Sequence, residues 1–148
     1  RYGFENAASY RVVEDVTLRS ALTYTNAQFR GGAFKGKEVP LVSKWSGNIG
    51  ASWNIWGKFV VLDGDLRYVG SRRFDNDQRN FQPLIPAHAL VDLKVGGEIG
   101  WAYWSFTVQN LLNKRYFDYG IASANTYGTY DAFPQPTRTM IGRVGVRF

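Results

Sequence analysis

Hydrophobic and polar residues alternate along most of this chain with a period of two, the period of a β-strand. The alternating segments, which predict seven strands, are residues 2–12, 16–28, 45–55, 60–70, 87–99, 101–113 and 139–148. One set of alternate positions in each segment is apolar, small or aromatic; in the third segment it comprises Trp45, Gly47, Ile49, Ala51, Trp53 and Ile55. Every charged residue of these segments lies on the other set. The pattern therefore predicts antiparallel strands with one apolar and one polar face.

The dimensions of the segments favour a transmembrane β-barrel over a soluble barrel or sandwich, which also alternates. Several segments have 11–13 residues, whereas a tilted membrane strand needs about 9–11 and a globular strand about 5–6. Short connections at 13–15, 56–59 and near 100 alternate with long loops at 29–44, 71–86 and 114–138. Outer-membrane barrels have short periplasmic turns and long extracellular loops. Aromatic residues also lie toward the ends of the apolar faces, as in a membrane girdle: Tyr10, Tyr24, Trp45, Trp53, Tyr68 and Trp104.

Composition and charge agree with this prediction. Hydrophobic residues make up 45% of the chain, yet the mean hydropathy is −0.29, and no run approaches the roughly 20 apolar residues of a membrane helix. The net charge is +6, but the basic residues are scattered and no nucleic-acid motif is present, so we expect an anionic lipid surface as partner rather than nucleic acid. The sequence opens at Arg1 without a signal peptide, and we expect a piece of a longer polypeptide.

No catalytic, metal or cofactor site is predicted. The chain has one histidine and no cysteine, and His88 and Asp92 would be about 13 Å apart along a strand, too far for a hydrogen bond. The charges in 63–67 share one face, where we expect lumen charges to balance one another. The acids in 75–77 resemble part of a calcium loop, but its remaining ligands are missing, so we expect solvated loop acids.

Three segments resemble motifs of TonB-dependent outer-membrane receptors. Residues 84–93 (LIPAHALVDL) resemble the strand "lPay.lvDl", residues 108–116 (VQNLLNKRY) resemble "v.NLfdkrY", and residues 133–139 (FPQPTRT) are similar to the "yP.pgRt" ending. Weaker similarities lie at 35–40 and 68–72. In the "v.NLfdkrY"-like segment we expect a structural role, ending the strand and fixing the departure of the loop, for Asn110, Lys114, Arg115 and Tyr116.

The resemblance implies an all-β, antiparallel transmembrane barrel of 22 strands, filled by an N-terminal plug domain. Residues 1–148 would be the C-terminal portion of that barrel and supply about seven strands. It also implies a bacterial outer-membrane receptor that imports a scarce large solute, most often a ferric siderophore, with energy from TonB acting through an N-terminal part. A passive porin-like or structural barrel is the alternative, and a soluble lipid-binding barrel is a more distant one. No feature names the solute.

The end of the chain resembles the signal read by the barrel-assembly machinery, through Val144, Val146 and Phe148. This signal usually has a glycine five residues before the final aromatic residue. Here that position is Arg143, with glycines at Gly142 and Gly145. We expect the alternating apolar residues to suffice for the assignment.

In a receptor of this kind, recognition belongs to the extracellular loops, which meet the arriving solute. Basic side chains there would attract an anionic chelate, and aromatic faces would suit a large, flat or catecholate-like ligand. The candidate ligand contacts are Arg72, Arg73, Arg79, Tyr116, Phe117, Tyr119, Tyr127 and Tyr130. The alternative is that these residues pack the loops together or meet the phosphates of lipopolysaccharide.

Overall fold

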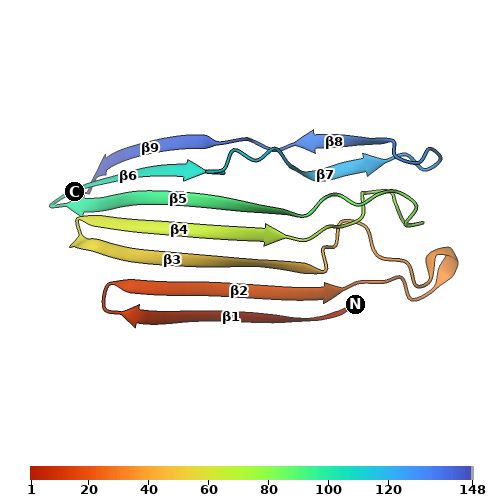
Figure 1. Ribbon diagram of the computed structural model, residues 1–148, viewed down its shortest axis with the longest axis horizontal. Helices are drawn as coiled ribbons and strands as arrows, with labels where there is room; N and C mark the ends of the chain where they lie inside the picture. Colours follow the sequence, from red (N-terminus) through yellow and green to blue (C-terminus); the bar gives the residue numbers. More distant parts are fainter. Residues whose placement is uncertain (148) are drawn as a thin grey trace.

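The computed structural model of the chain describes residues 1–147 and is dominated by one long antiparallel sheet (Figure 1). Its strands are β1 (Tyr2–Val13), β2 (Val16–Asn26), β3 (Trp45–Lys58), β4 (Val60–Val69), β5 (His88–Ile99), β6 (Ala102–Gln109) and β9 (Thr139–Val146). The order in the sheet is β1-β2-β3-β4-β5-β6-β9. The seven predicted strands and their antiparallel pairing are thus confirmed, and we call this sheet the wall.

The region 114–138, predicted as a loop, contains two further strands. β7 (Phe117–Ala122) and β8 (Tyr130–Pro134) form a separate antiparallel hairpin. These strands have only six and five residues, which is too short to show a clear alternation, so the period-two pattern did not predict them. The loop after β2 contains a short 3₁₀ helix, η1 (Gly32–Phe34). Within residues 1–147, no helix has the length and apolar character to cross a membrane.

Asp63 and Asp65, on the polar face of the wall, are balanced by a cation of the same face, as expected. The Arg19 guanidinium lies 3.8 Å from a carboxylate oxygen of Asp63 and 3.8 Å from one of Asp65, although β3 separates β2 from β4. Gly50 lies between them in the register, opposite both Arg19 and Asp65. A Cβ at Gly50 would collide with the Asp65 carboxylate. Glycine at this position therefore leaves the space in which the arginine reaches across a strand.

The apolar face of the wall is exposed and carries aromatic residues near the loop end. Tyr24 and Trp45 are cross-strand neighbours with ring centroids 4.7 Å apart, and the ring of Phe4 lies 5.9 Å from each. Ile49 is 63% exposed and Val144 is 84% exposed. An apolar surface of this extent is unfavourable in water, whereas a lipid bilayer accommodates it.

The C-terminal motif lies on this same apolar face. Val144 pairs with Trp104, and Val146 pairs with Ala102. Phe148, the third residue of the predicted assembly signal, lies outside the described residues.

The hydrophobic core lies away from the wall. Phe74, Ile85 and Ala122 are buried together, and Phe117 packs against them. All four belong to the long connections or to the β7–β8 hairpin. These segments gather at one end of the wall, opposite the short turns (Figure 1).

Candidate functional site

The three long connections form one packed unit, which we call the loop assembly and define as residues 27–44, 70–87 and 110–138. Backbone bridges join it internally: Arg72 pairs with Ile85, and Asp75 pairs in parallel with Ile121 of β7. The Asp75 N–H donates to Gly120 O (3.0 Å), and the Ala122 N–H donates to Asp75 O (3.1 Å). The β4–β5 loop is therefore joined to the hairpin by a single parallel β-bridge.

Phe74 is the centre of this unit. Its ring centroid lies 4.5 Å from that of Tyr130 and 6.0 Å from that of Phe117, and its side chain is 1% exposed. A Cβ at Gly120 would collide with the Phe74 ring. The glycine of β7 thus allows the aromatic ring to pack directly against the hairpin backbone.

Gln82 fastens the hairpin turn to the β4–β5 loop. Its side-chain amide donates to Ser123 O (2.7 Å) and Thr126 O (2.9 Å), and it accepts from the Gly128 N–H (2.8 Å). The residue is 3% exposed, so these bonds satisfy a buried amide. Sequence reasoning did not identify Gln82, because no local pattern marks a glutamine that binds a segment more than forty residues away.

Asp77 corrects the expectation that the acids in 75–77 are solvated. Its side chain is 3% exposed and accepts from the Phe81 N–H (2.7 Å). The Arg73 guanidinium lies 3.9 Å from its other oxygen. Asp75 in turn accepts from the Tyr119 hydroxyl (2.6 Å), which raises the pKa of that tyrosine. The acids hold the loop together, and no group of three metal-ligating side chains occurs among residues 1–147.

Asp118 ties the hairpin to the wall. Arg72 donates to its carboxylate (2.8 Å) and to its backbone oxygen (2.6 Å), and His88 Nε2 lies 3.2 Å from the same carboxylate oxygen. Arg72 and His88 are 7% and 4% exposed. The Tyr116 ring packs on His88 with ring centroids 4.7 Å apart. Burial of the Tyr116 hydroxyl raises the pKa of that tyrosine. His88 therefore pairs with Asp118 and not with Asp92.

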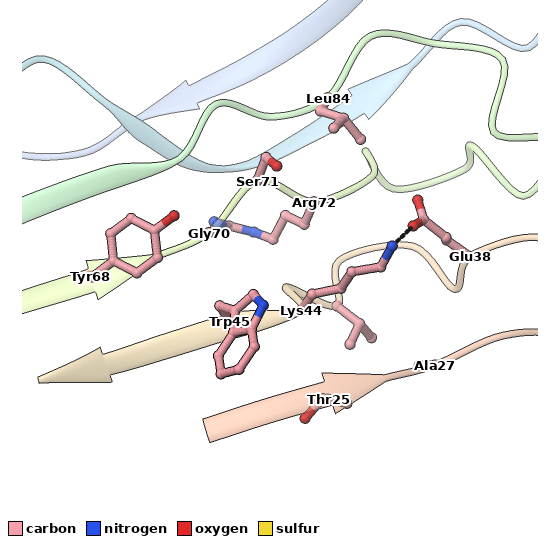
Figure 2. Close-up of a pocket in the computed structure, with 11 residues that line it drawn as sticks. Thr25, Ala27, Glu38, Lys44, Trp45, Tyr68, Gly70, Ser71, Arg72 and Leu84 are labelled. Atoms are coloured by element: carbon pink, nitrogen blue, oxygen red, sulfur yellow. Dashed lines mark ion pairs between the residues drawn. The ribbon is translucent and has the colours of Figure 1, made fainter. Parts of the chain in front are cut away.

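Glu38 connects the β2–β3 loop to the others. It pairs with Lys44 (2.6 Å) and Arg73 (2.9 Å). The hydrogen bond from Lys44 is the main reason that the Glu38 pKa is lowered and the Lys44 pKa raised. The Asn80 amide also bonds the Glu38 backbone at both N–H and C=O. The ion pair to Lys44 borders a cavity of about 200 Å³ near the ends of β2, β3 and β4 (Figure 2).

Asn110 has the structural role expected of it. Its φ of +50° ends β6, so the strand stops before the predicted residues 110–113. Its side-chain amide donates to Lys114 O (2.8 Å) and accepts from the Lys114 N–H (2.9 Å). Its backbone N–H donates to the Asp92 carboxylate (2.7 Å). The residue therefore closes the turn that leads into the hairpin.

The structure divides the eight candidate ligand contacts into two groups. The larger group makes the structural contacts described above and comprises Arg72, Arg73, Tyr116, Phe117, Tyr119 and Tyr130. The smaller group comprises Arg79, which is exposed and has no ion pair within residues 1–147, and Tyr127, which is 65% exposed. Tyr130 of the larger group is also 43% exposed, so three of the eight candidate side chains are exposed: Arg79, Tyr127 and Tyr130.

A cavity of about 190 Å³, which we call the apex pocket, lies beside Arg79. Phe34 enters it from the β2–β3 loop, Phe81 from the β4–β5 loop and Ser123 from the hairpin turn. The Tyr127 ring packs edge-on against Phe81 with centroids 5.4 Å apart. Sequence reasoning did not identify Phe34 and Phe81, although each lies in a loop that also carries basic residues. A cation beside aromatic faces suits a planar, anionic group.

Comparison with known proteins places the chain in a family. Residues 1–113 match the family model described as "TonB dependent receptor-like, beta-barrel". The search of curated proteins found no match.

Solved structures share the fold at low sequence identity. The ferric citrate transporter FecA in its unliganded form superimposes with a TM-score of 0.81 at 19% identity, over 99% of this chain and 24% of that one. The closed form of the ferric-catecholate import receptor Fiu from E. coli K12 gives 0.80 at 16% identity, over 99% and 20%. The ferric yersiniabactin uptake receptor FyuA from Yersinia pestis gives 0.78 at 20%, over 96% and 22%. The chain thus spans between a fifth and a quarter of the length of these structures.

Proposed function

The chain belongs to the TonB-dependent receptor-like β-barrel family, and on that premise we propose that it is part of a receptor for the energised uptake of a large anionic solute. The class of solute that we propose is a ferric siderophore. Residues 1–148 would form the C-terminal portion of the barrel, and TonB would act on another part of the receptor. The family is one of transport receptors, and we propose no enzymatic activity and no nucleic-acid partner.

The observation that carries the proposal is the apex pocket. Three separate connections converge there, and Arg79, a cation without an ion pair in the described chain, lines the pocket together with Phe34 and Phe81. The carboxylate residue of the lining, Asp77, is paired with Arg73. The loop assembly holds these groups in place without a ligand, which lowers the entropic cost of binding. We therefore assign ligand contact to Arg79 and Tyr127, with Phe34 and Phe81 as additional contacts.

We also propose that the wall lies in the bacterial outer membrane. The exposed apolar face would contact lipid, the aromatic residues at the loop end would lie at the interface, and basic loop residues would meet lipopolysaccharide phosphates. The barrel-assembly machinery would read Val144, Val146 and Phe148 at the end of the chain.

The experiment is a binding and uptake assay with a panel of radioactive ferric chelates. The variant Arg79→Gln combined with Phe81→Ala should weaken binding of the cognate chelate about tenfold or more, the equivalent of one lost charge-assisted contact. Arg30→Gln, which removes an exposed charge from the β2–β3 loop outside the apex pocket, is the matched control. Equal binding by both variants would contradict the site.

The energy requirement separates a receptor from a passive barrel. Uptake should stop when the inner-membrane proton gradient is collapsed, while surface binding persists. Uptake that continues without the gradient would favour the passive barrel.

A further inference from the structure

A second hollow lies on the polar face of the wall, toward the short-turn end and far from the apex pocket. It has a volume of about 500 Å³ and opens among β4, β5, β6 and β9, which are neighbours in the sheet (Figure 1). We call it the wall pocket. Its charged lining consists of four cations and two carboxylates: Lys58, Lys94, Arg143, Arg147, Asp63 and Glu98.

The two carboxylates are already engaged. Glu98 pairs with Arg147 at 2.9 Å, and Asp63 lies 3.8 Å from the Arg19 guanidinium. Within residues 1–147, no carboxylate lies within 4.0 Å of the amino group of Lys58 or Lys94 or of the guanidinium of Arg143. The wall pocket therefore carries an excess of positive charge, which attracts anions most strongly in a partly enclosed space.

The strand register explains why there is room for a ligand. Gly96 of β5 pairs with Ser105 of β6, and Ser105 pairs with Arg143 of β9. The glycine and the serine form a floor of small residues beside the arginine. Lys94 lies two residues from Gly96 on the same face, so the two cations flank this floor from different strands.

Tyr103 forms another side of the wall pocket. It pairs with Gly145, and a Cβ at Gly145 would collide with the tyrosine ring. The Tyr103 ring thus lies over Gly145, which belongs to β9, the strand that also carries Arg143. This packing keeps the tyrosine from filling the space above Ser105, and it adds a phenol to the polar lining.

We propose that the wall pocket is a binding site for an oxyanion group, a carboxylate or a phosphate. The lysines supply compact charges, the guanidinium of Arg143 supplies paired donors that match the oxygens of such a group, and Ser105 supplies a hydroxyl. The site does not depend on the solute proposed for the apex pocket. Its oxyanion comes either from a free solute in the lumen or from a carboxylate side chain of polypeptide lying there.

The test uses the purified protein in detergent micelles with inorganic phosphate as the probe. Phosphate is titrated against chloride at constant ionic strength while heat of binding and Tm are recorded. Lys94→Gln combined with Arg143→Gln should weaken phosphate binding about tenfold or more. Arg11→Gln removes a charge from the same face of the wall but outside the wall pocket and should bind phosphate like the unsubstituted protein. The charge-conserving pair Lys94→Arg and Arg143→Lys should restore most of the binding.

The two sources of the oxyanion give different results. If a free solute supplies it, the unsubstituted protein binds phosphate as described. If polypeptide supplies it, phosphate does not bind, but Lys94→Gln with Arg143→Gln lowers Tm more than Arg11→Gln does, and the charge-conserving pair restores Tm. The proposal is overturned if phosphate does not bind and the neutral pair has the same Tm as Arg11→Gln.

Discussion

The wall and the loop assembly are stabilised in different ways. In the wall, backbone pairing orders long strands whose apolar side chains remain exposed, up to 84% for Val144. In the loop assembly, buried side chains order the chain. Three of the four buried hydrophobic residues, Phe74, Ile85 and Ala122, lie there. The wall requires an apolar environment outside the protein, whereas the loop assembly carries its own core.

This difference has a functional consequence. A loop that is ordered only by its ligand loses conformational entropy on binding, whereas a packed loop has already lost it. The side chains of Gln82 and Asp77 bind backbone groups of the loop assembly, and the Arg72 guanidinium binds both the backbone oxygen and the carboxylate of Asp118. The apex pocket is therefore expected to be formed before the proposed solute arrives.

The largest expected effect comes from the core of the loop assembly. Phe74→Ala should destabilise the loop assembly by about 3–5 kcal/mol, since it removes a buried ring and leaves a cavity. Limited proteolysis should then cut within 71–86 and 117–134. Phe106→Ala, at a 43% exposed position of the apolar wall face, is the control and should leave both segments resistant. Cleavage at the same rate in both variants would contradict the difference between the two regions.

Gln82→Ala should have the next largest effect. It leaves the carbonyls of Ser123 and Thr126 and the N–H of Gly128 without their partner, at a cost of about 1–3 kcal/mol. Hydrogen exchange should accelerate at 123–128 and leave β2 and β3 unchanged. Gln109→Ala, at an exposed position of the wall, is the control and should leave exchange at 123–128 unchanged. If Gln82→Ala also leaves exchange at 123–128 unchanged, the Gln82 amide does not hold the turn.

Acid should loosen the attachment of the β2–β3 loop. The Glu38 pKa is lowered by Lys44 and Arg73 from its usual 4.5, so this contribution to stability is complete above pH 4.5 and is lost as the pH falls through the lower, folded value. Hydrogen exchange at 35–44, corrected for its intrinsic pH dependence, should rise only below that pH. Glu38→Gln should show the faster exchange already at pH 7. A rise between pH 6 and 8 in the unsubstituted protein would assign the attachment to another group.

The smallest effect is expected in the wall. Arg19→Gln removes two ion pairs of 3.8 Å, and partly exposed pairs contribute about 0–1 kcal/mol. The Tm in detergent should change by little more than the error of measurement. A loss of stability as large as that expected for Gln82→Ala would show that side-chain contacts stabilise the wall as well.

The wall could be predicted from sequence because lipid enforces a strict sorting of side chains. A charge on the lipid face costs about 2–4 kcal/mol at mid-depth, so the period-two pattern survives along every strand. No comparable rule sorts apolar and charged side chains along the sequence of the loop assembly. Its contacts join residues as distant as Arg72 and Asp118, and Arg72 looks like a solvent-facing cation until that partner is known. For the same reason the hairpin β7–β8 could not be predicted.

Hydrogen exchange of the unliganded protein in micelles tests most directly whether the loop assembly is ordered without ligand, as we infer. Amides bonded within the unit, such as those of Asp75, Ile85 and Ala122, should exchange on the time scale of the wall strands, minutes to hours. Exchange of these amides within seconds, with protection gained only when the solute binds, would contradict the account.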